Sequence, residues 1–370
     1  MQNQSLPILI FAQSARHIAQ SAAQAGFIVW VADCFADVDT LAVAQRHYKL
    51  PPLSQLSRKQ ILQILHELSA GESCELICGT GIERLYPFLE QLPKNIRLVG
   101  NTAETIHTLK TPTLFFDLLA QLALTFPTSQ FQPPTFDQDK WLFKPAYEMG
   151  GDGIHFVMKD TPEPQGYYQQ FIEGTSVSVL FASDGINTQL ISVNRQICSE
   201  TQPKPFQLLA IETPYDLPKT TLAELQSAIA KLTHATGLVG LNSLDLIIDD
   251  QGKSYLLEIN PRISASAQIA TLPESAFLCH YHSCKGRLPS IPLLPTQTSQ
   301  KLYYLFAPEK LLIPEGMQWP MQCHDIPCDG TSIDTNMPIC TLVLYGLPAQ
   351  IDLQQRNLSE KILKKLQLAS

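Results

Sequence analysis

Short apolar runs alternate with helical stretches through the first hundred residues, and this alternation constrains the fold more than any other feature. Strands separated by helices predict βαβ units and a parallel sheet. The predicted strands are Ile8–Ala12, Phe27–Ala32, Glu75–Cys78 and Arg97–Val99, and the predicted helices are one that ends at Gly26, then Arg58–Ser69 and Ile82–Leu92. We therefore expect a Rossmann-like domain over residues 1–105.

Two turns of this predicted domain bear on ligand binding. The turn after the first strand, Ala12-Gln13-Ser14-Ala15, has no glycine, so it lacks the G-x-G-x-x-G pattern of a dinucleotide site. A dehydrogenase-type site is therefore not expected. The turn Gly79-Thr80-Gly81 follows the third strand and opens a helix. A substrate-binding turn and a plain strand–helix connection are equally open readings there.

Composition excludes several classes of protein. The chain has 370 residues, 45% hydrophobic and 16% charged, which predicts two to three globular domains. Its net charge of −8 argues against nucleic-acid binding. The most apolar stretch, Leu114–Phe126, contains Asp117 and is too short to span a membrane. Met1–Pro7 has no basic segment typical of a secretory signal. We expect a cytoplasmic protein without a membrane partner.

The nine cysteines are expected to be reduced thiols rather than a disulfide framework. The segment Cys279–Cys284 contains two histidines between its cysteines, which suggests a metal site at first sight. Adjacent positions on a helix point in different directions, so buried or surface thiols are the preferred interpretation. The same interpretation applies to Cys323 and Cys328.

A lysine followed by a glycine-rich turn is the first feature that suggests chemistry. The apolar strand at residues 140–144 ends in Lys144, and Gly150, Gly151 and Gly153 follow. Glycines let backbone N–H groups approach phosphate oxygens, and lysine adds a positive charge. A tight hairpin turn is the alternative, but the lysine favours a phosphate loop.

A predicted hairpin carries the second feature. Its strands, at residues 243–248 and 254–259, contain Asp245 and Glu258, and Asn260 shares the strand face of Glu258. Pairing of the two strands would bring the three side chains together as oxygen ligands suited to Mg²⁺. Arg262 follows in the same alternation and can stabilise a phosphoryl group. A surface hairpin with solvated acids is the alternative.

The ordered set of these motifs resembles the ATP-grasp superfamily over roughly residues 1–290. Within that superfamily the compact chain is similar to the small-substrate branch, such as the tyramine–glutamate ligases. The motifs that carry the resemblance are Lys110, Lys144 with its glycine turn, Gln169-Gln170-Phe171-Ile172-Glu173-Gly174, Asp245, and Glu258-Ile259-Asn260-Pro261-Arg262. The resemblance implies an ATP-grasp fold of two α+β subdomains after the Rossmann-like domain.

The resemblance also implies residue roles and cofactors. ATP would bind through Lys110, Lys144, Gly150, Gly151 and Gly153, with Gln169, Gln170, Phe171, Ile172 and Glu173 as the adenine hinge. Mg²⁺, with Mn²⁺ as a possible substitute, would bind Asp245, Glu258 and Asn260. Arg262 and Lys144 would be the catalytic cations. Gln169 departs from a glutamate that many members carry, and Thr175–Ser176 replaces a common ribose-binding acid.

The implied activity is ATP-dependent ligation of a small carboxylate, an amino acid or a cofactor precursor, to an amine through an acyl phosphate, releasing ADP and phosphate. The alternative is a non-catalytic nucleotide-binding regulator with the same fold. The expected partners are the two small substrates, with a homodimer as a possible assembly. Candidates for substrate contact are Arg195, Gln196, Ser264, Ser266, Gln268, Tyr147 and His155, the last of which also fits a structural role.

The domain organisation that follows has four segments. After residues 1–105, we expect a small ATP-grasp subdomain with its linking helix at 106–180 and a large subdomain with the metal site at 181–290. Short apolar runs split by proline and glycine from about Leu302 onward predict a β-rich C-terminal subdomain at 291–370.

Overall fold

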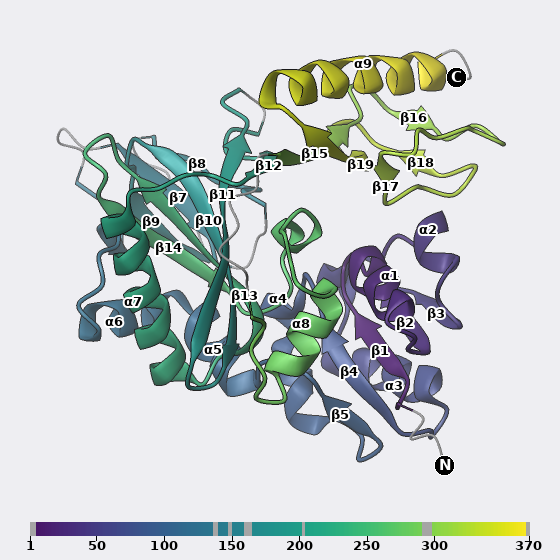
Figure 1. The fold of residues 1–370 in the computed structure, drawn as a ribbon, viewed down its shortest axis with the longest axis horizontal. Helices are drawn as coiled ribbons and strands as arrows, with labels where there is room; N and C mark the ends of the chain where they lie inside the picture. Colours follow the sequence, from purple (N-terminus) through teal and green to yellow (C-terminus); the bar gives the residue numbers. More distant parts are fainter. Residues whose placement is uncertain are drawn as a thin grey trace.

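The computed structural model describes residues 5–135, 140–146, 150–158, 165–201, 204–290 and 298–367. No helix in these described ranges is long and apolar enough to cross a membrane. Figure 1 shows a parallel sheet with its helices near the N-terminus, a pair of antiparallel sheets beside it, and C-terminal strands under a long last helix. The expected order of a Rossmann-like part followed by α+β parts is therefore observed.

The N-terminal part is a five-stranded parallel sheet in the order β3-β2-β1-β4-β5. Strand β3 was not predicted, because its residues are polar and only partly buried. Pro87 divides the predicted helix at residues 82–92 into α4 and η2. The elements are β1 (Ile8–Phe11), α1 (Arg16–Gln24), β2 (Val29–Asp33), α2 (Val38–Leu41), β3 (Arg46–Lys49), η1 (Leu53–Gln55), α3 (Arg58–Ser69), β4 (Cys74–Cys78), α4 (Ile82–Leu85), η2 (Tyr86–Gln91) and β5 (Ile96–Leu98).

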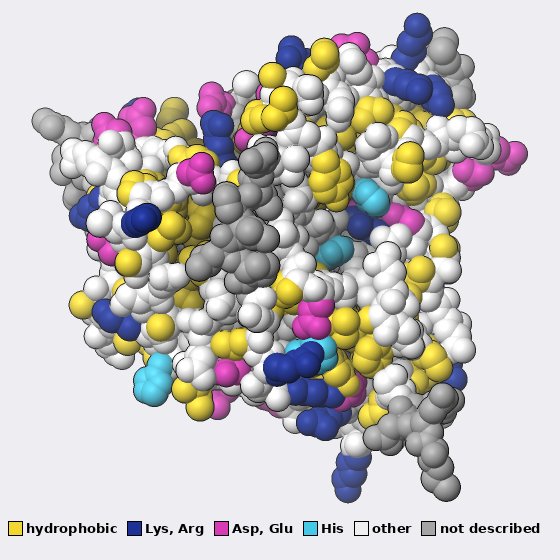
Figure 2. Space-filling view, in the orientation of Figure 1, with side chains coloured by type: hydrophobic (Ala, Val, Ile, Leu, Met, Phe, Trp, Pro, Cys, Tyr) yellow, Lys and Arg dark blue, Asp and Glu magenta, His cyan; other side chains and the backbone are white. Residues whose placement is uncertain are grey.

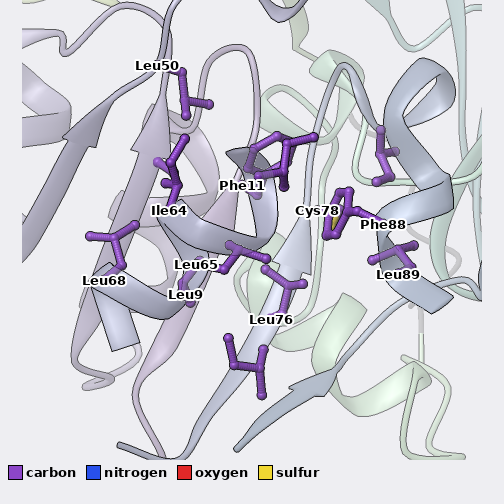
Figure 3. Packing of buried hydrophobic residues seen from close by; sticks show 14 of the residues in the cluster. Leu9, Phe11, Leu50, Ile64, Leu65, Leu68, Leu76, Cys78, Phe88 and Leu89 are labelled. Carbon is purple, nitrogen blue, oxygen red and sulfur yellow. The ribbon is translucent and has the colours of Figure 1, made fainter. Parts of the chain in front are cut away.

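Both faces of this sheet are covered, which explains why its strands read as continuous apolar runs. On one face Leu9 and Leu76 pack against Leu65 of α3 and against Phe88 of η2 (Figure 3). On the other face Ile10 packs among residues of α1 and of α8 (Ala276–Ser283). The helix α8 also contacts the large antiparallel sheet, so one core contains residues of both sheets, among them Ile10 and Leu241.

The middle of the chain forms a small and a large antiparallel sheet. The small sheet has the order β6-β9-β7-β8, and the large one has the order β14-β13-β10-β11-β12-β15-β19-β17. Their elements and the linking helices are α5 (Ala103–Lys110), α6 (Pro112–Gln121), β6 (Ser129–Gln130), β7 (Trp141–Pro145), β8 (His155–Phe156), β9 (Gly166–Gln170), β10 (Thr175–Asp184), β11 (Thr188–Cys198), β12 (Leu208–Thr213), α7 (Lys219–Thr236), β13 (Val239–Ile248), β14 (Ser254–Asn260) and η3 (Ala265–Gln268).

The two faces of the large sheet differ in chemistry. Val177, Val193 and Leu244 pack in one core with residues of α7 on one face of the sheet. Because side chains alternate along a strand, their neighbours Ser178 and Asn194 point to the opposite face. That polar face carries the residues described below as the candidate site.

Most of the C-terminal strands continue the large sheet, and two short ones pair in a separate two-stranded sheet. Strand β12 pairs with β15, and β15 pairs with β19. The last helix, α9, was not predicted and covers these strands in Figure 1. The elements are β15 (Ser299–Phe306), β16 (Leu311–Leu312), β17 (Cys323–His324), β18 (Ser332–Ile333), β19 (Pro338–Gly346) and α9 (Pro348–Gln367). All of β10 belongs to the large sheet.

Buried polar side chains dock the N-terminal part on the large sheet. The Asn101 amide donates to Asn242 Oδ1 at 2.8 Å and to the Pro261 carbonyl at 2.9 Å, and its Oδ1 accepts from Val239 N at 2.9 Å. His280 of α8 accepts from Leu241 N at 3.0 Å through Nδ1. These bonds satisfy groups that have no access to water.

The second ring nitrogen of His280 contacts the N-terminal part, so the imidazole links that part to the large sheet. Nε2 lies 3.2 Å from the Val99 carbonyl, and the residue is 1% exposed. Burial lowers the pKa of His280 to about 4. A proton on Nδ1 would also remove the acceptor for Leu241 N, so the fold requires the neutral imidazole.

A charged contact joins the N-terminal part to the C-terminal strands. Arg16 at the start of α1 donates to both carboxylate oxygens of Asp325, at 3.1 and 3.0 Å. Asp39 accepts from the backbone N–H groups of Asp325 and Ile326. Figure 2 shows basic, acidic and histidine side chains together at this boundary. The three parts of the chain are therefore tied together by buried or half-buried polar groups.

Substituting Asn101→Ala should lower the free energy of unfolding by roughly 2–4 kcal/mol, since it leaves the buried Val239 N–H and the Pro261 carbonyl without their partner. Urea unfolding followed by circular dichroism measures the change. The control is Asn95→Ala, which removes hydrogen bonds to Ser69 and Glu72 at a partly exposed position of the same domain. It should lower the free energy of unfolding by less than half as much as Asn101→Ala. Equal losses in the two variants would contradict the docking role.

The His280 imidazole should make stability depend on pH. Its pKa is lower in the folded state than the usual 6.5, so the unfolded chain binds the proton first. The stabilisation is complete above pH 6.5 and is lost as the pH falls toward 4, by at most about 1.4 kcal/mol per unit. His280→Gln keeps an acceptor and a donor but cannot titrate. The stability difference between wild type and variant should shrink between pH 6.5 and 5, and a constant difference would refute the prediction. The exposed His66→Gln is the control.

Candidate functional site

The hairpin of β13 and β14 brings the predicted metal ligands together. Asp245 and Glu258 are direct partners in the register of the two strands, so they share one face of the sheet, as expected from the hairpin. Asn260 donates from Nδ2 to Asp245 Oδ2 at 2.9 Å. The three side chains therefore present oxygen atoms on the polar face of the large sheet.

Further polar groups on the same face orient Asp245. Gln196 of β11 donates from Nε2 to Asp245 Oδ1 at 3.3 Å, and Ser176 of β10 donates to Gln196 Oε1 at 2.7 Å. Both Asp245 oxygens thus have a donor. Gln196 was a candidate for contact with substrate or phosphate, and it lies on the polar face beside Asp245.

Arg195 lies on the opposite face of the sheet. The register pairs it with Val177, whose side chain packs toward α7, and with Glu212. The sequence placed Arg195 after a strand, but it lies within β11. This position argues against contact with a substrate at Asp245.

Three cations surround the carboxylates. Lys110, the last residue of α5, donates from Nζ to Glu258 Oε2 at 2.8 Å and to the Ile259 carbonyl at 3.3 Å. Lys144, near the end of β7, is close enough to influence the ionisation of both acids. Arg262, just after β14, donates from Nε to Glu83 Oε1 at 2.7 Å. The predicted cations therefore converge on the predicted acids.

Burial and neighbouring charges shift the pKa values of Asp245 and Glu258 in opposite directions. Burial raises the pKa of Asp245 to about 7, and the charge of Glu258 adds to this effect. Glu258 is about half exposed, so its desolvation is partial; the ion pair with Lys110 outweighs this desolvation and lowers the pKa of Glu258. The negative charge of Asp245 is consequently less well balanced by neighbouring cations than that of Glu258.

The donor set fits a divalent cation. Asp245 and Glu258 supply carboxylate oxygens and Asn260 supplies an amide oxygen, the hard ligands that Mg²⁺ prefers. A cation beside Asp245 would replace the proton that its raised pKa retains. Asp245, Glu258 and Asn260 are therefore the residues that would hold the ion.

The glycine turn lies between β7 and β8, which are antiparallel neighbours. Gly150, Gly151 and Gly153 all have positive φ, at 64°, 82° and 73°. A Cβ on Gly151 would come within 2.0 Å of the Phe206 carbonyl oxygen. The turn is thus a hairpin turn and also a close approach of backbone to the loop before β12. Residues 147–149, and with them the candidate Tyr147, lie outside the described residues.

Part of the predicted adenine hinge, residues 169–173, is already hydrogen-bonded within or beside the small sheet. Gln169 is buried and donates to Ser129 Oγ at 3.0 Å, so its side chain holds β6 to β9. The backbone N–H groups of Gln170 and Phe171 donate to the Thr128 and Lys140 carbonyls. An adenine would therefore have to use other backbone groups of the hinge. Ile172 and Glu173 lie in the short connection between β9 and β10.

The remaining candidates for substrate contact have protein partners. The hydroxyls of Ser264 and Ser266 lie 2.8 Å apart, just where η3 begins. Gln268 accepts a hydrogen bond from Arg16, and His155 Nδ1 lies 2.9 Å from the Gly153 carbonyl. These contacts favour the structural interpretation of each residue.

The cysteine–histidine segment is part of α8. Both ring nitrogens of His280 are used by backbone groups, and His282 pairs with Glu274. Within the described residues, no group of three or more histidine, cysteine or acidic side chains is arranged to hold a metal ion.

Sequence reasoning gave Glu83 no role beyond its place in the Gly79–Glu83 turn. Its carboxylate, 6% exposed, pairs with Arg262 from a position 179 residues away in the chain. Burial opposes ionisation of Glu83, but the charges of Arg262 and Lys110 outweigh it and lower the pKa. No local pattern could reveal this pair, because only the docking of two domains creates it.

Comparison with known sequences places a family domain over this site. Residues 113–266 match the family described as the ATP-grasp domain. The chain is 24% identical over 288 residues to the carbamoyl phosphate synthase large chain of Mycobacterium tuberculosis, which covers 69% of this chain and 25% of the relative. A Rhodopirellula baltica protein of the same description is 23% identical over 195 residues, covering 46% of this chain and 18% of its own length. The chain thus spans about a quarter or less of the curated relatives that it matches.

Solved structures share the fold along almost the whole chain. The L-amino acid ligase of Bacillus licheniformis superimposes with a TM-score of 0.69 at 15% identity, covering 97% of this chain and 98% of that one. The biotin carboxylase of Campylobacter jejuni gives 0.71 at 15% identity, covering 94% and 89%. N5-carboxyaminoimidazole ribonucleotide synthetase of Thermotoga maritima gives 0.68 at 13% identity, covering 97% and 98%. The predicted ATP-grasp fold is therefore confirmed.

The Lys144 amine should titrate far below an ordinary lysine. Burial lowers its pKa to about 8, while the charges of Glu258 and Asp245 partly oppose the effect. Glu258→Gln removes one of these charges, so the Lys144 pKa should fall further. Reductive ¹³C-methylation and NMR titration measure both values, with Lys144→Arg to assign the signal. An unchanged or higher pKa in Glu258→Gln would contradict the described electrostatics.

Proposed function

We propose that the ATP-grasp domain of this chain makes it an ATP-dependent, ADP-forming ligase that joins a small carboxylate to an amine. The observation that carries the proposal is the convergence of Asp245, Glu258 and Asn260 with three cations on one face of the large sheet. A site that only holds a nucleotide does not need three cations around two acids. A site that transfers a phosphoryl group does, since charge has to be stabilised as it moves.

The residues have separate parts in the proposed reaction. Mg²⁺ held by Asp245, Glu258 and Asn260 would supply charge neutralisation for the ATP phosphates. Lys144 and Arg262 would contact the phosphoryl group in transfer, and Lys110 would keep Glu258 ionised through their ion pair. The glycine turn at residues 150–153 would lie over the phosphates. Catalysis would then consist of positioning and charge stabilisation, without a protein nucleophile.

The proposed chemistry has two steps. An oxygen of the carboxylate attacks the γ-phosphorus of ATP, ADP leaves, and an acyl phosphate forms. The amine then attacks the acyl carbon, and the C–O bond to phosphate breaks. One oxygen of the original carboxylate therefore leaves with the phosphate, and the amine loses a proton.

The substrate class is proposed as small amino acids or a cofactor precursor. The L-amino acid ligase of Bacillus licheniformis supports it, because that protein matches this chain along nearly its whole length. This substrate class is also that of the small-substrate branch that includes the tyramine–glutamate ligases, to which we propose the chain belongs. A regulator that binds nucleotide without turnover would keep the fold but would not need Glu258.

Purified protein should release ADP from Mg-ATP only when the right carboxylate and amine are both present. A panel of amino acids paired with amines identifies them, and mass spectrometry identifies the amide. With an ¹⁸O-labelled carboxylate, one label should appear in the released phosphate. Tight Mg-ATP binding without turnover on any pair would favour the regulator.

Glu258→Gln should lower the rate of ADP release about 100-fold or more, since it removes a charged ligand from the proposed metal site. Its side chain is 48% exposed, so the substitution should leave folding intact. The matched control is Glu224→Gln, an exposed carboxylate on α7, and it should keep the wild-type rate. A wild-type rate of ADP release in Glu258→Gln would refute the assignment of Glu258 as a ligand of Mg²⁺.

A further inference from the structure

One buried ion pair connects the N-terminal domain to the proposed phosphate site. Arg262 Nε donates to Glu83 Oε1 at 2.7 Å, and the two side chains are 11% and 6% exposed. Arg262 follows β14, whereas Glu83 lies in α4, at the carboxyl end of β4 in the other domain. The phosphate-facing cation is therefore held by a residue outside the family-matched segment 113–266.

The turn before α4 fixes the position of the Glu83 carboxylate. Its second oxygen, Oε2, accepts from the backbone N–H of Gly81 at 2.8 Å. Gly81 has a φ of 104°, and a Cβ there would meet Leu53 Cδ1 at 2.1 Å, so this conformation requires glycine. With one oxygen on the backbone and the other on Arg262, the carboxylate has little freedom to move.

The other donors of Arg262 are left for a ligand. Nη1 lies 3.3 Å from the Ile263 carbonyl, a long hydrogen bond, and Nε is taken by Glu83. In the described part of the chain, no other protein acceptor lies within hydrogen-bond distance of the guanidinium. The planar group thus has one edge fixed by Glu83, while its remaining N–H groups can serve an anion.

We propose that Glu83 is a positioning residue, which holds the Arg262 guanidinium in the orientation that receives the γ-phosphate of ATP. The proposal rests on the function proposed above. It means that the N-terminal domain completes the phosphate site through Glu83, which contacts Arg262.

Glu83 is suited to positioning and unsuited to proton transfer. The charges of Arg262 and Lys110 outweigh its burial and lower its pKa, so the carboxylate stays ionised and cannot readily accept a proton from an amine. Arg262, in turn, gains a fixed direction that a flexible side chain would lack.

A purely structural ion pair is the alternative, and the chain offers a control for it. Arg16 and Asp325 form a second, part-buried arginine–carboxylate pair between distant parts of the chain, and neither residue contacts Asp245, Glu258 or Arg262 among the described hydrogen bonds and ion pairs. Asp325→Asn should lower thermal stability without changing nucleotide selectivity. Glu83→Gln should change the selectivity itself.

The experiment compares affinities for a non-hydrolysable ATP analogue and for ADP, both with Mg²⁺, by isothermal titration calorimetry. Wild type should bind the analogue more tightly than ADP. Glu83→Gln should lower this ratio about tenfold through misplacement of Arg262. Arg262→Gln should lower it at least as much, and the double variant should show no further loss. Glu83→Asp, which keeps the charge but shortens the side chain, should give an intermediate ratio and replaces Glu83→Gln if that variant does not fold.

The outcomes separate this proposal from the ligase proposal. A wild-type ratio in Glu83→Gln, or losses that add in the double variant, would overturn the positioning role while ligation still stood. If Glu83→Gln lowers the ratio but the wild-type protein ligates no substrate pair of the panel, the positioning role stands and the ligase proposal is refuted. No preference of wild type for the analogue over ADP would overturn the positioning role directly, because Arg262 would then not receive the γ-phosphate.

Discussion

The register of the hairpin β13–β14 is the constraint on which the site depends. Asp245 faces Glu258 across the two strands, and a bulge follows immediately between Asp245 and Leu246. A slip of β14 by one residue would turn Glu258 into the apolar face that packs against α7 and separate it from Asp245. Leu244 and Ile259 occupy that face and belong to its core. Hydrophobic packing on one side of the sheet therefore determines where the charges lie on the other.

The docking of the N-terminal domain is the second condition. Asn101 and His280 form the buried contacts that hold this domain to β13, and Glu83 reaches Arg262 across the same boundary. Each contact is a polar group in a dry environment, where a misplaced partner costs more than in water. Such contacts favour a single relative position of the two domains, which a purely apolar boundary would define less sharply.

Local pattern was sufficient for some elements and insufficient for others. The helix Arg58–Ser69 was predicted, and so was the hairpin that places Asp245 and Glu258 on one face, because periodicity and a short turn depend on neighbouring residues. Strand β3 was missed because Arg46–Lys49 is polar and half-exposed. The helix α9 was missed although Ile351, Ile362 and Leu366 are its buried residues. The roles of Gln196 and Glu83 depend on contacts between distant segments, which no single stretch of sequence contains.

The continuation of the large sheet into the C-terminal strands has a consequence for how the chain can be divided. Strand β12 is an interior strand only because β15 pairs with it, and β15 in turn is covered by β19. The outermost strand on that side, β17, is only two residues long, and such a short edge offers little for another chain to pair with. A chain cut near residue 290 would expose the full edge of β12, with open N–H and C=O groups. Its aggregation would then report on a broken sheet and would say nothing about whether the last eighty residues take part in catalysis.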